Sequence, residues 1–306
     1  MSKTYQEECR ARSIYASINF ELTKKRKSFD INKIEEELLS YSDNQHFRFR
    51  IFYHTVLSMI YKHRQDKTKE LRNYEEAIQF FKQNQLDYYS EWKFTKDLAK
   101  LYLEEKSYKI AASKINKALL LPPEGGFNWH LSMQQKAILG FHTQKLGLVL
   151  STQKKALQQA SDANIIKGQW LLIGAWLAIF EKLGKIQTGT SFRLYRFQNE
   201  VELPPVHRPL LLIIEGIYLL LQKQKKQFLL WKEKTATISI PKTHHVRTKI
   251  MLKMLYKIES CDYHPISVQR HTAPLLKKMQ AIPIPVEVEF VPYEWLWELI
   301  MEWLRK

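Results

Sequence analysis

The stretch KDLAKLYLEEKSYKIAASKINKALLLPP, residues 96 to 123, has the pattern of two short helices joined by a tight turn. Apolar and small residues recur at helical spacing on both sides of the EEKS segment, as the buried faces of two packed helices require. The prolines at 122 and 123 end the second helix, because proline cannot continue one. We therefore expect a helical hairpin, which is either isolated or one unit of a repeated array.

The composition of the whole chain favours helices. Of its 306 residues, 45% are hydrophobic and 12% aromatic, which is ample material for a core, while only 9 are glycine and 11 proline. So few turn-forming residues are incompatible with the closely spaced turns of a β-sandwich. We predict an all-α fold.

Cysteine usage and hydropathy bear on the compartment. Cys9 and Cys261 lie far apart and follow no disulfide-framework spacing, which favours a reducing environment. The first residues lack the apolar core of a signal peptide, and the most apolar stretches, 170–180 and 210–221, are too short to span a bilayer. We expect both stretches to be buried helices, no contact with a membrane, and a cytoplasmic location.

Helical periodicity and helix breakers divide the chain into regions. In the first pair of helices, Asp30 is placed to cap the second one. Further pairs follow, the last of them running from about 163 to 202. The predicted regions are an N-terminal helix pair (1–44), a repeat array (45–205), a divergent helical continuation (206–280), and a strand followed by an apolar helix (281–306).

A large apolar residue followed directly by a small one recurs along the array. Leu57–Ser58, Leu98–Ala99 and Leu139–Gly140 follow one another at a constant spacing, and Ile173–Gly174 comes next at a shorter one. The small residue lets the paired helix approach closely, and the large one fills the space beside that contact. This regularity predicts a repeated unit.

The set of residues around these pairs resembles a tetratricopeptide repeat (TPR), a helix-turn-helix unit with a period of roughly 34 residues. The unit in the opening stretch matches best, although Thr95 stands where the family prefers Trp. A partial match lies on each side of it. The later one has the preferred Trp, at Trp170, and the earlier one carries several extra residues between its helices. The matching positions are Leu98, Ala99, Tyr102, Ala111, Ile115, Ala118 and Pro123 in the best unit, Trp170, Ile173, Gly174 and Leu177 after it, and Leu57, Ser58, Tyr61, Tyr74, Ala77 and Phe81 before it.

The resemblance covers about residues 50–205 and implies antiparallel helix pairs stacked as a right-handed α-solenoid; another α-solenoid or a bundle is the alternative. It also implies a concave surface, built from the first helix of each pair, that holds a peptide or a partner protein. Lys93, Lys96 and Lys100 form one stripe of such a helix and would suit an acidic or carboxylate-ended ligand. The alternative is that they form an ordinary solvated face, since the Asn of the family's carboxylate clamp is absent.

The formal charge of +17 favours encounters with polyanions. Arg247, Lys249, Lys253 and Lys257 form one basic set on a predicted helix, and residues 24–27 and 223–226 form two others. Such residues could contact nucleic-acid phosphates. No recognition-helix or RNA-binding signature accompanies them, so solvated helix faces are the other interpretation.

The C-terminal region has a different spacing of apolar residues. Val286, Val288 and Phe290 alternate with Glu287 and Glu289, which predicts a half-buried strand. An apolar helix follows, and its candidate docking residues are Trp295, Trp297 and Trp303. We expect this helix either to cap the array or to dock a partner or a second copy.

Signatures of catalysis are lacking in the sequence. The only adjacent glycines, Gly125 and Gly126, have no phosphate-binding sequel, and the spacing of Cys261 and His264 lacks the further paired ligands of a zinc site. We therefore expect no enzyme, no metal and no cofactor. The predicted function is a non-catalytic scaffold or adaptor for a protein or peptide partner that is acidic, by charge complementarity; a nucleic-acid-binding subunit is the alternative.

Overall fold

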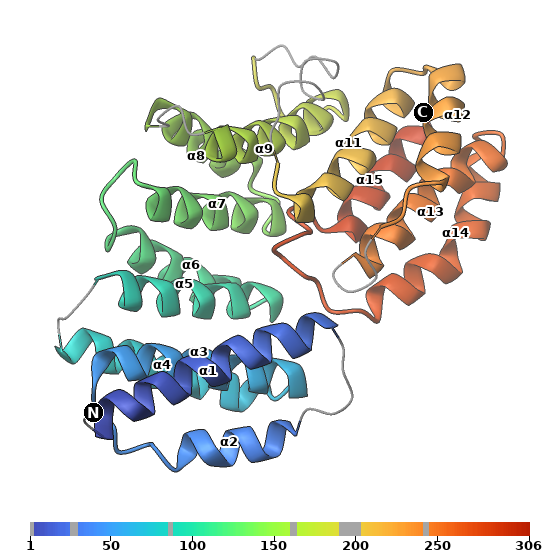
Figure 1. Cartoon of the computed structure of the whole chain (residues 1–306). Coiled ribbons are helices and arrows are strands. Elements are labelled where there is room, and N and C mark those ends of the chain that lie inside the picture. Colours follow the sequence, from blue (N-terminus) through green and yellow to red (C-terminus); the bar gives the residue numbers. More distant parts are fainter. Residues whose placement is uncertain (1–2, 25–29, 85–87, 160–163, 190–202, 241–244) are drawn as a thin grey trace. The chain divides into compact units, whose positions relative to one another are not determined.

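The computed structural model describes residues 3–24, 30–84, 88–159, 164–189, 203–240 and 245–306. Over these ranges the chain forms fourteen α-helices and no strand, so the predicted all-α class is confirmed (Figure 1). The helices are α1 (Lys3–Lys24), α2 (Ile31–Leu39), α3 (Phe47–Arg64), α4 (Lys67–Asn84), α5 (Tyr88–Glu104), α6 (Tyr108–Leu119), α7 (Phe127–His142), α8 (Leu146–Gln159), α9 (Asn164–Lys182), α11 (Arg208–Leu221), α12 (Lys225–Ala236), α13 (Val246–Ser260), α14 (Pro265–Gln280) and α15 (Tyr293–Leu304), with a 3-10 turn, η1 (Pro205–His207), before α11.

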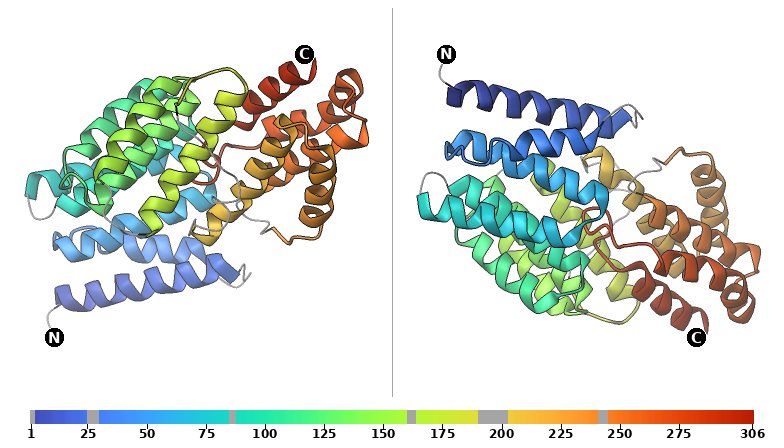
Figure 2. Two further views of the ribbon diagram at one scale, coloured as in Figure 1. Left: turned by 90° about the horizontal axis from the view of Figure 1, so that it is seen from above. Right: turned by 90° about the horizontal axis from the view of Figure 1, so that it is seen from below.

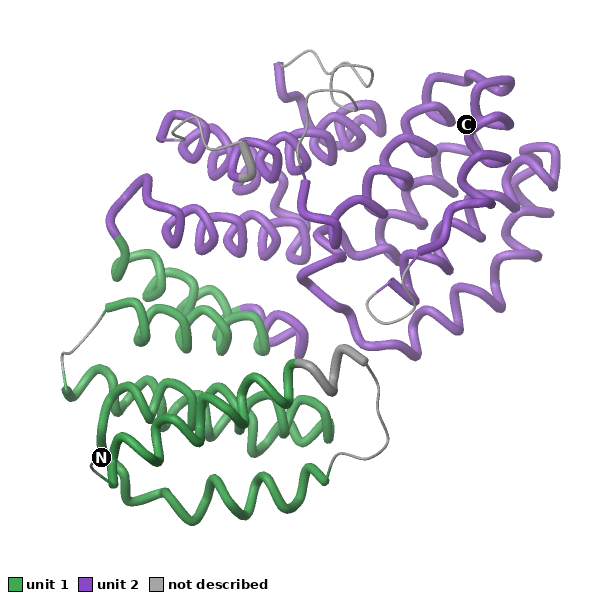
Figure 3. The backbone as a smooth tube through the Cα atoms, viewed as in Figure 1, with its two compact units in different colours: residues 1–102, 109–122 green, residues 103–108, 123–306 purple. Residues whose placement is uncertain are grey.

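The chain forms two compact units (Figure 3). Unit 1 comprises residues 1–102 and 109–122, and unit 2 comprises residues 103–108 and 123–306. The boundary therefore falls inside the region 45–205 that was predicted as one array. Residues 281–306, predicted as a separate region, belong to unit 2.

Unit 1 is built on apolar helix faces. α1 and α2 both pack against α3, and Asp30 caps α2 as predicted, its Oδ1 accepting from the backbone N–H of Asn32 at 3.0 Å and of Lys33 at 3.2 Å. A second cluster joins α4 to α5, where the Phe81 and Phe94 rings stack with centroids 5.6 Å apart. Burying a side chain of this size stabilises a fold by about 1.5–3 kcal/mol.

The opening stretch forms the hairpin α5–α6. Leu98, Ala99, Ala111 and Ala118 are all fully buried, as the TPR-like pattern predicted for the packed faces. A salt bridge of 3.1 Å from Lys117 near the end of α6 to Glu91 near the start of α5 links the two helices, which fits an antiparallel arrangement.

In unit 2, successive helices pack as pairs α7–α8, α11–α12 and α13–α14, which can be followed in Figure 1 and Figure 2. The structure shows why a small residue follows Leu139 in the pair Leu139–Gly140. A Cβ added at Gly140 would lie only 2.6 Å from Val149 Cγ2 of α8. A Cβ added at Gly216 would lie 2.3 Å from the Trp231 ring of α12, and one added at Gly174 would lie 2.5 Å from Gln153 Nε2 of α8. Small residues thus set the close approach of neighbouring helices.

A left-handed residue ends one helix after another. Gln65, Lys106, Gln144, Gly184, Lys223 and Asp262 have φ between 52° and 72° and follow α3, α5, α7, α9, α11 and α13. Beyond most of these turns, a backbone N–H reaches back to a carbonyl of the preceding helix, as in Lys145 to Gly140 (2.8 Å) and Lys185 to Phe180 (2.9 Å), the bond of a Schellman-type helix end. The turns recur at a nearly constant interval, which is longer than the roughly 34 residues of a TPR.

The prediction of a strand before α15 is wrong. Val286, Val288 and Phe290 are buried and Glu287 is exposed, as expected, but Glu289 and Val291 are buried as well, so the alternation of buried and exposed residues breaks down after Val288. The Pro285 carbonyl accepts from Val288 N and Glu289 N, both at 2.9 Å, which closes a turn. The alternation therefore marks a buried irregular segment, since no neighbouring strand in the described part of the chain offers a ladder.

Two further predictions concern the apolar stretches and the last helix pair. The stretch 170–180 lies in α9 and is almost wholly buried, and 210–221 lies in α11. None of the helices described here has the length and hydropathy that crossing a bilayer requires. The second half of the pair predicted at 163–202 falls on residues 190–202, which lie outside the described ranges.

Candidate functional site

The three lysines predicted to bind a partner lie together on α5 around one carboxylate. Asp97 Oδ1 is 3.1 Å from Lys96 Nζ, and Asp97 Oδ2 is 3.6 Å from Lys93 Nζ. Lys100 also acts electrostatically on Asp97. We call Lys93, Lys96, Asp97 and Lys100 the lysine face; with three cations and one anion it carries a net charge of +2.

The lysine face is half-buried and includes a contact to a second helix. The side chains of Lys93, Lys96 and Asp97 are each about a quarter exposed. Lys93 Nζ donates to Thr55 Oγ1 of α3 at 3.3 Å, and the same ammonium lies 4.3 Å from the centroid of the Phe94 ring. These contacts fix the position of the lysine instead of leaving it as a freely rotating chain.

The charges on this face are coupled. Burial alone would raise the pKa of Asp97, but the cations of Lys96, Lys93 and Lys100 outweigh it and hold that pKa below its usual value. Burial lowers the pKa of Lys93, against the opposing effect of Asp97. The lysines of this face outnumber its carboxylate, and an anion brought to this surface would be attracted to them.

Sequence reasoning missed both Asp97 and Thr55. The i, i+4 spacing of Lys93 and Asp97 was a signal for the first, because such pairs meet on one face of a helix. Nothing in the sequence indicated Thr55, which lies 38 residues away and reaches the lysine only through the packing of unit 1.

Arg247, predicted as a nucleic-acid contact, lies instead in the interior of unit 2 with its side chain 1% exposed. It forms a bidentate pair with Glu289, at 2.6 Å from Nε and 2.8 Å from Nη2, and Nη2 also donates to Glu294 Oε2 at 2.6 Å. Nη1 donates to the carbonyls of Met279 (2.6 Å) and Ile282 (2.9 Å). This set is called the arginine network, and its guanidinium has no donor left for a phosphate.

Electrostatics favour the charged form of this arginine. Burial alone would lower the pKa of Arg247, but its hydrogen bonds and charge interactions with Glu289 and Glu294 raise it above the ordinary value. Glu289 Oε1 also accepts from the backbone N–H of Tyr293 at 3.0 Å, so the network holds the first turn of α15. Bidentate pairing of this kind fixes geometry as well as charge.

The other three members of that basic set remain at the surface. Lys253 and Lys257 are exposed and Lys249 is half-buried. Successive lysines lie one helical turn apart on α13. These three members of the predicted basic set are therefore accessible.

The three tryptophans predicted as docking residues differ in exposure. Trp297 is buried (3% exposed) and is unavailable to a partner. Trp295 is half-buried and stacks on Phe180 of α9, with ring centroids 4.7 Å apart. Trp303 is half-buried and lines a cavity. The apolar belt of α15 is thus largely used within unit 2, where α15 also packs against α14.

Cys261 and His264, which were weighed as metal ligands, have other contacts. Both cysteines are free thiols. Cys261 Sγ lies 3.6 Å from His271 Nδ1, while His264 caps α14 by accepting from Ser267 N at 3.4 Å. His244 falls outside the described residues. Within the described ranges no three such side chains converge on a common point.

No protein-family model matches this sequence, and no curated protein or solved structure is significantly similar to it. The assignment of a function therefore depends on the geometry of the described residues.

Proposed function

We propose that this chain is a non-catalytic scaffold built on TPR-like helix pairs, which binds an acidic segment of a protein partner at the lysine face. The observation that carries the proposal is the convergence of Lys93, Lys96 and Lys100 on the single carboxylate of Asp97. A partner's Asp and Glu side chains would complement the net charge of +2, and Thr55 adds a hydroxyl beside Lys93.

The repeat character of the fold supports a binding surface. The left-handed turns recur after α3, α5, α7, α9, α11 and α13, and small residues allow α7 to pack closely on α8 and α11 on α12. A right-handed solenoid with a period somewhat longer than that of a TPR is the arrangement that we infer from this recurrence. Such arrays present the first helix of each pair to a ligand, and α5 is the first helix of its pair.

The test is binding of a fluorescein-labelled Asp/Glu-rich peptide, followed by fluorescence polarisation. The variant Lys96→Glu/Lys100→Glu reverses two charges of the lysine face and leaves the buried end of Lys93 in place. We expect it to abolish saturable binding while the circular dichroism spectrum stays unchanged, because like charges would now face the peptide.

The matched control is Lys253→Glu/Lys257→Glu, which makes the same charge change on α13. It should bind the peptide as the wild type does. Equal binding by wild type and the Lys96/Lys100 variant would refute the role of the lysine face, and equal loss in both variants would show that only the total charge matters.

The second candidate function is nucleic-acid binding through Lys249, Lys253 and Lys257. The observation in its favour is that Lys253 and Lys257 are exposed on one face of α13. Polarisation titrations with an oligonucleotide at about 50 mM and about 200 mM salt would test it, since phosphate contacts weaken steeply with salt. Affinity purification with and without nuclease would then separate protein partners from nucleic-acid partners.

A further inference from the structure

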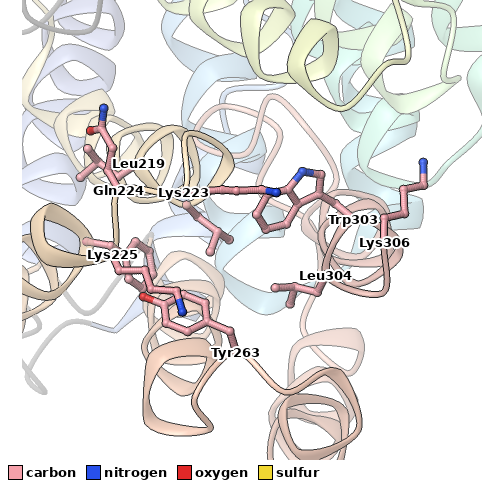
Figure 4. A pocket seen from close by; sticks show the side chains of 10 residues that line it. Leu219, Lys223, Gln224, Lys225, Tyr263, Trp303, Leu304 and Lys306 are labelled. Carbon is pink, nitrogen blue, oxygen red and sulfur yellow. The ribbon is translucent and has the colours of Figure 1, made fainter.

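Unit 2 contains a cavity of about 300 Å³ at the junction of α11, α12 and α15, shown in Figure 4. Its apolar lining comes from four parts of the chain. Leu219 and Leu220 belong to the end of α11, Phe228 to α12, and Trp303 and Leu304 to α15. The ring of Tyr263, which follows α13, completes the lining. This volume is at the lower end of the range for sites that hold small molecules.

The polar part of the lining is cationic. Lys223, Lys225 and Lys306 are exposed and border the cavity, and none of its ten lining residues is acidic. Lys225 Nζ lies 4.7 Å from the centroid of the Tyr263 ring. Close by, Glu259 is hydrogen-bonded to Lys232, so this carboxylate already has a partner; Asp262 is the other acidic residue next to Tyr263.

Backbone geometry fixes the two lysines beside the apolar lining. Lys223 occupies the left-handed position after α11, where its N–H donates to the Leu220 carbonyl at 2.9 Å and the N–H of Gln224 donates to Leu219 at 3.1 Å. Lys225 is the first residue of α12. The Lys223 side chain extends toward Trp303, and the Lys225 side chain lies beside Tyr263 (Figure 4).

One polar atom in the lining residues lacks a partner. The Tyr263 hydroxyl is buried and makes no hydrogen bond with any described residue. A buried hydroxyl without an acceptor costs free energy. A ligand carboxylate at Lys225 that displaced the cover of this hydroxyl would supply an acceptor.

We propose that this cavity binds a small amphipathic carboxylate, a molecule with an apolar body of medium chain length and a single anionic end. The body would lie against Phe228, Trp303 and Leu304, and the carboxylate would lie at Lys223 and Lys225. An inorganic anion would leave the apolar lining uncovered, and a cation would be repelled by three ammonium groups. The site lies in unit 2 and shares no residue with the lysine face, so it does not depend on the proposed scaffold function.

The experiment is calorimetric titration of the full chain with decanoate, kept below its micelle concentration. Three control ligands separate the contributions to binding. Acetate has the negative charge but no apolar chain, decanol has the apolar chain but no charge, and decyltrimethylammonium has the apolar chain with a positive charge. We expect saturable binding of decanoate with one site per chain, no binding of acetate or of the cation, and binding of decanol at least about tenfold weaker, as expected when charge interactions near a protein surface are lost.

Variants locate the site. Lys223→Glu/Lys225→Glu should weaken decanoate binding at least about tenfold, because it places like charges at the carboxylate. Trp303→Ala should weaken it through lost apolar contact and keep the preference for decanoate over decanol. The matched control, Lys249→Glu/Lys253→Glu on α13 of the same unit, should bind as the wild type does, and so should Lys96→Glu/Lys100→Glu.

Folding of each variant is checked by circular dichroism. The proposal is overturned if the folded wild type does not bind decanoate, or if the folded Lys223/Lys225 variant binds it as tightly as the wild type. Displacement of decanoate by an oligonucleotide, with the oligonucleotide itself bound through Lys223 and Lys225, would assign these lysines to nucleic acid and likewise overturn it.

Discussion

The lysine face on α5 and Arg247 on α13 began as the same kind of sequence feature, a set of basic residues at intervals of two to four along one predicted helix. The structure separates them. Lys93 and Lys96 keep about a quarter of their side chains exposed around Asp97, whereas Arg247 is 1% exposed and enclosed by Glu289, Glu294 and two carbonyls. Helical spacing identifies residues that share a face, and distant segments decide whether that face is covered.

The largest effect is expected from breaking the arginine network. Arg247→Met leaves Glu289 buried without its counter-charge, and removal of one partner of a buried ion pair costs about 3–5 kcal/mol. Urea unfolding followed by circular dichroism measures the loss. The control is Lys253→Met on the exposed face of the same helix, which should change the free energy of unfolding by less than about 0.5 kcal/mol. Similar effects in the two variants would contradict this contrast between a buried and an exposed cation.

A smaller effect is expected from acidification, which acts on a buried histidine beside the same network. His142 Nε2 donates to the Glu289 carbonyl at 3.4 Å, and burial lowers the pKa of His142 from 6.5 to about 4. Above pH 6.5 the ring is neutral in both folded and unfolded chains. Below it the unfolded chain binds a proton that the folded chain does not, so stability falls as the pH drops from 6.5 towards 4.

At about 1.4 kcal/mol per pKa unit, the contribution of His142 reaches about 3 kcal/mol near pH 4. His142→Gln should therefore reduce the pH dependence of the unfolding free energy between pH 6.5 and 4 relative to wild type, while His54, whose pKa burial also lowers to about 4, keeps its own contribution. A His142 variant with the wild-type slope would show that another group governs acid stability.

The smallest effect on stability is expected at the lysine face. Asp97→Asn removes the carboxylate from a partly exposed ion-pair cluster, and such pairs contribute about 1 kcal/mol or less. The net charge of the face rises from +2 to +3, so an acidic peptide should bind roughly fivefold more tightly, as an added interaction of about 1 kcal/mol implies.

Both quantities are measured on one preparation, stability by urea unfolding and affinity by polarisation. A loss above about 3 kcal/mol, the range of a broken buried ion pair, would make the lysine face a structural network like that of Arg247. Weaker peptide binding in the Asn variant would show that Asp97 organises the lysines and does not merely compete for them.

Much of the local structure was predictable. Asp30 caps α2 as predicted, and the large–small pairs lie at close helix contacts such as Gly140 with Val149. These features depend on interactions within a few turns of helix or on a single neighbouring helix. The placement of Lys93, Lys96 and Lys100 together on one helix was predictable for the same reason.

The failures concern residues whose environment comes from far along the chain. The alternation from Val286 to Phe290 suggested a strand, but a strand needs a partner ladder, and here the segment forms a turn whose carbonyls at Glu289 and Glu287 accept from the His142 and His207 rings. The Trp297 ring and the Arg247 guanidinium are buried. No local sequence pattern indicates which distant segment will cover a given helix face.

The helices, their caps and the small residues that let them pair follow from local sequence, because they depend on periodicity and on backbone hydrogen bonds within a few residues. Which charges are buried and which cavities form depends on the packing of segments that lie far apart along the chain. Glu289 lies 42 residues from Arg247 and Thr55 lies 38 residues from Lys93, and Trp303 shares a cavity with Leu219 of α11. Burial depends on the surfaces that folding brings together, and it is burial that makes one basic residue structural and leaves another available for binding.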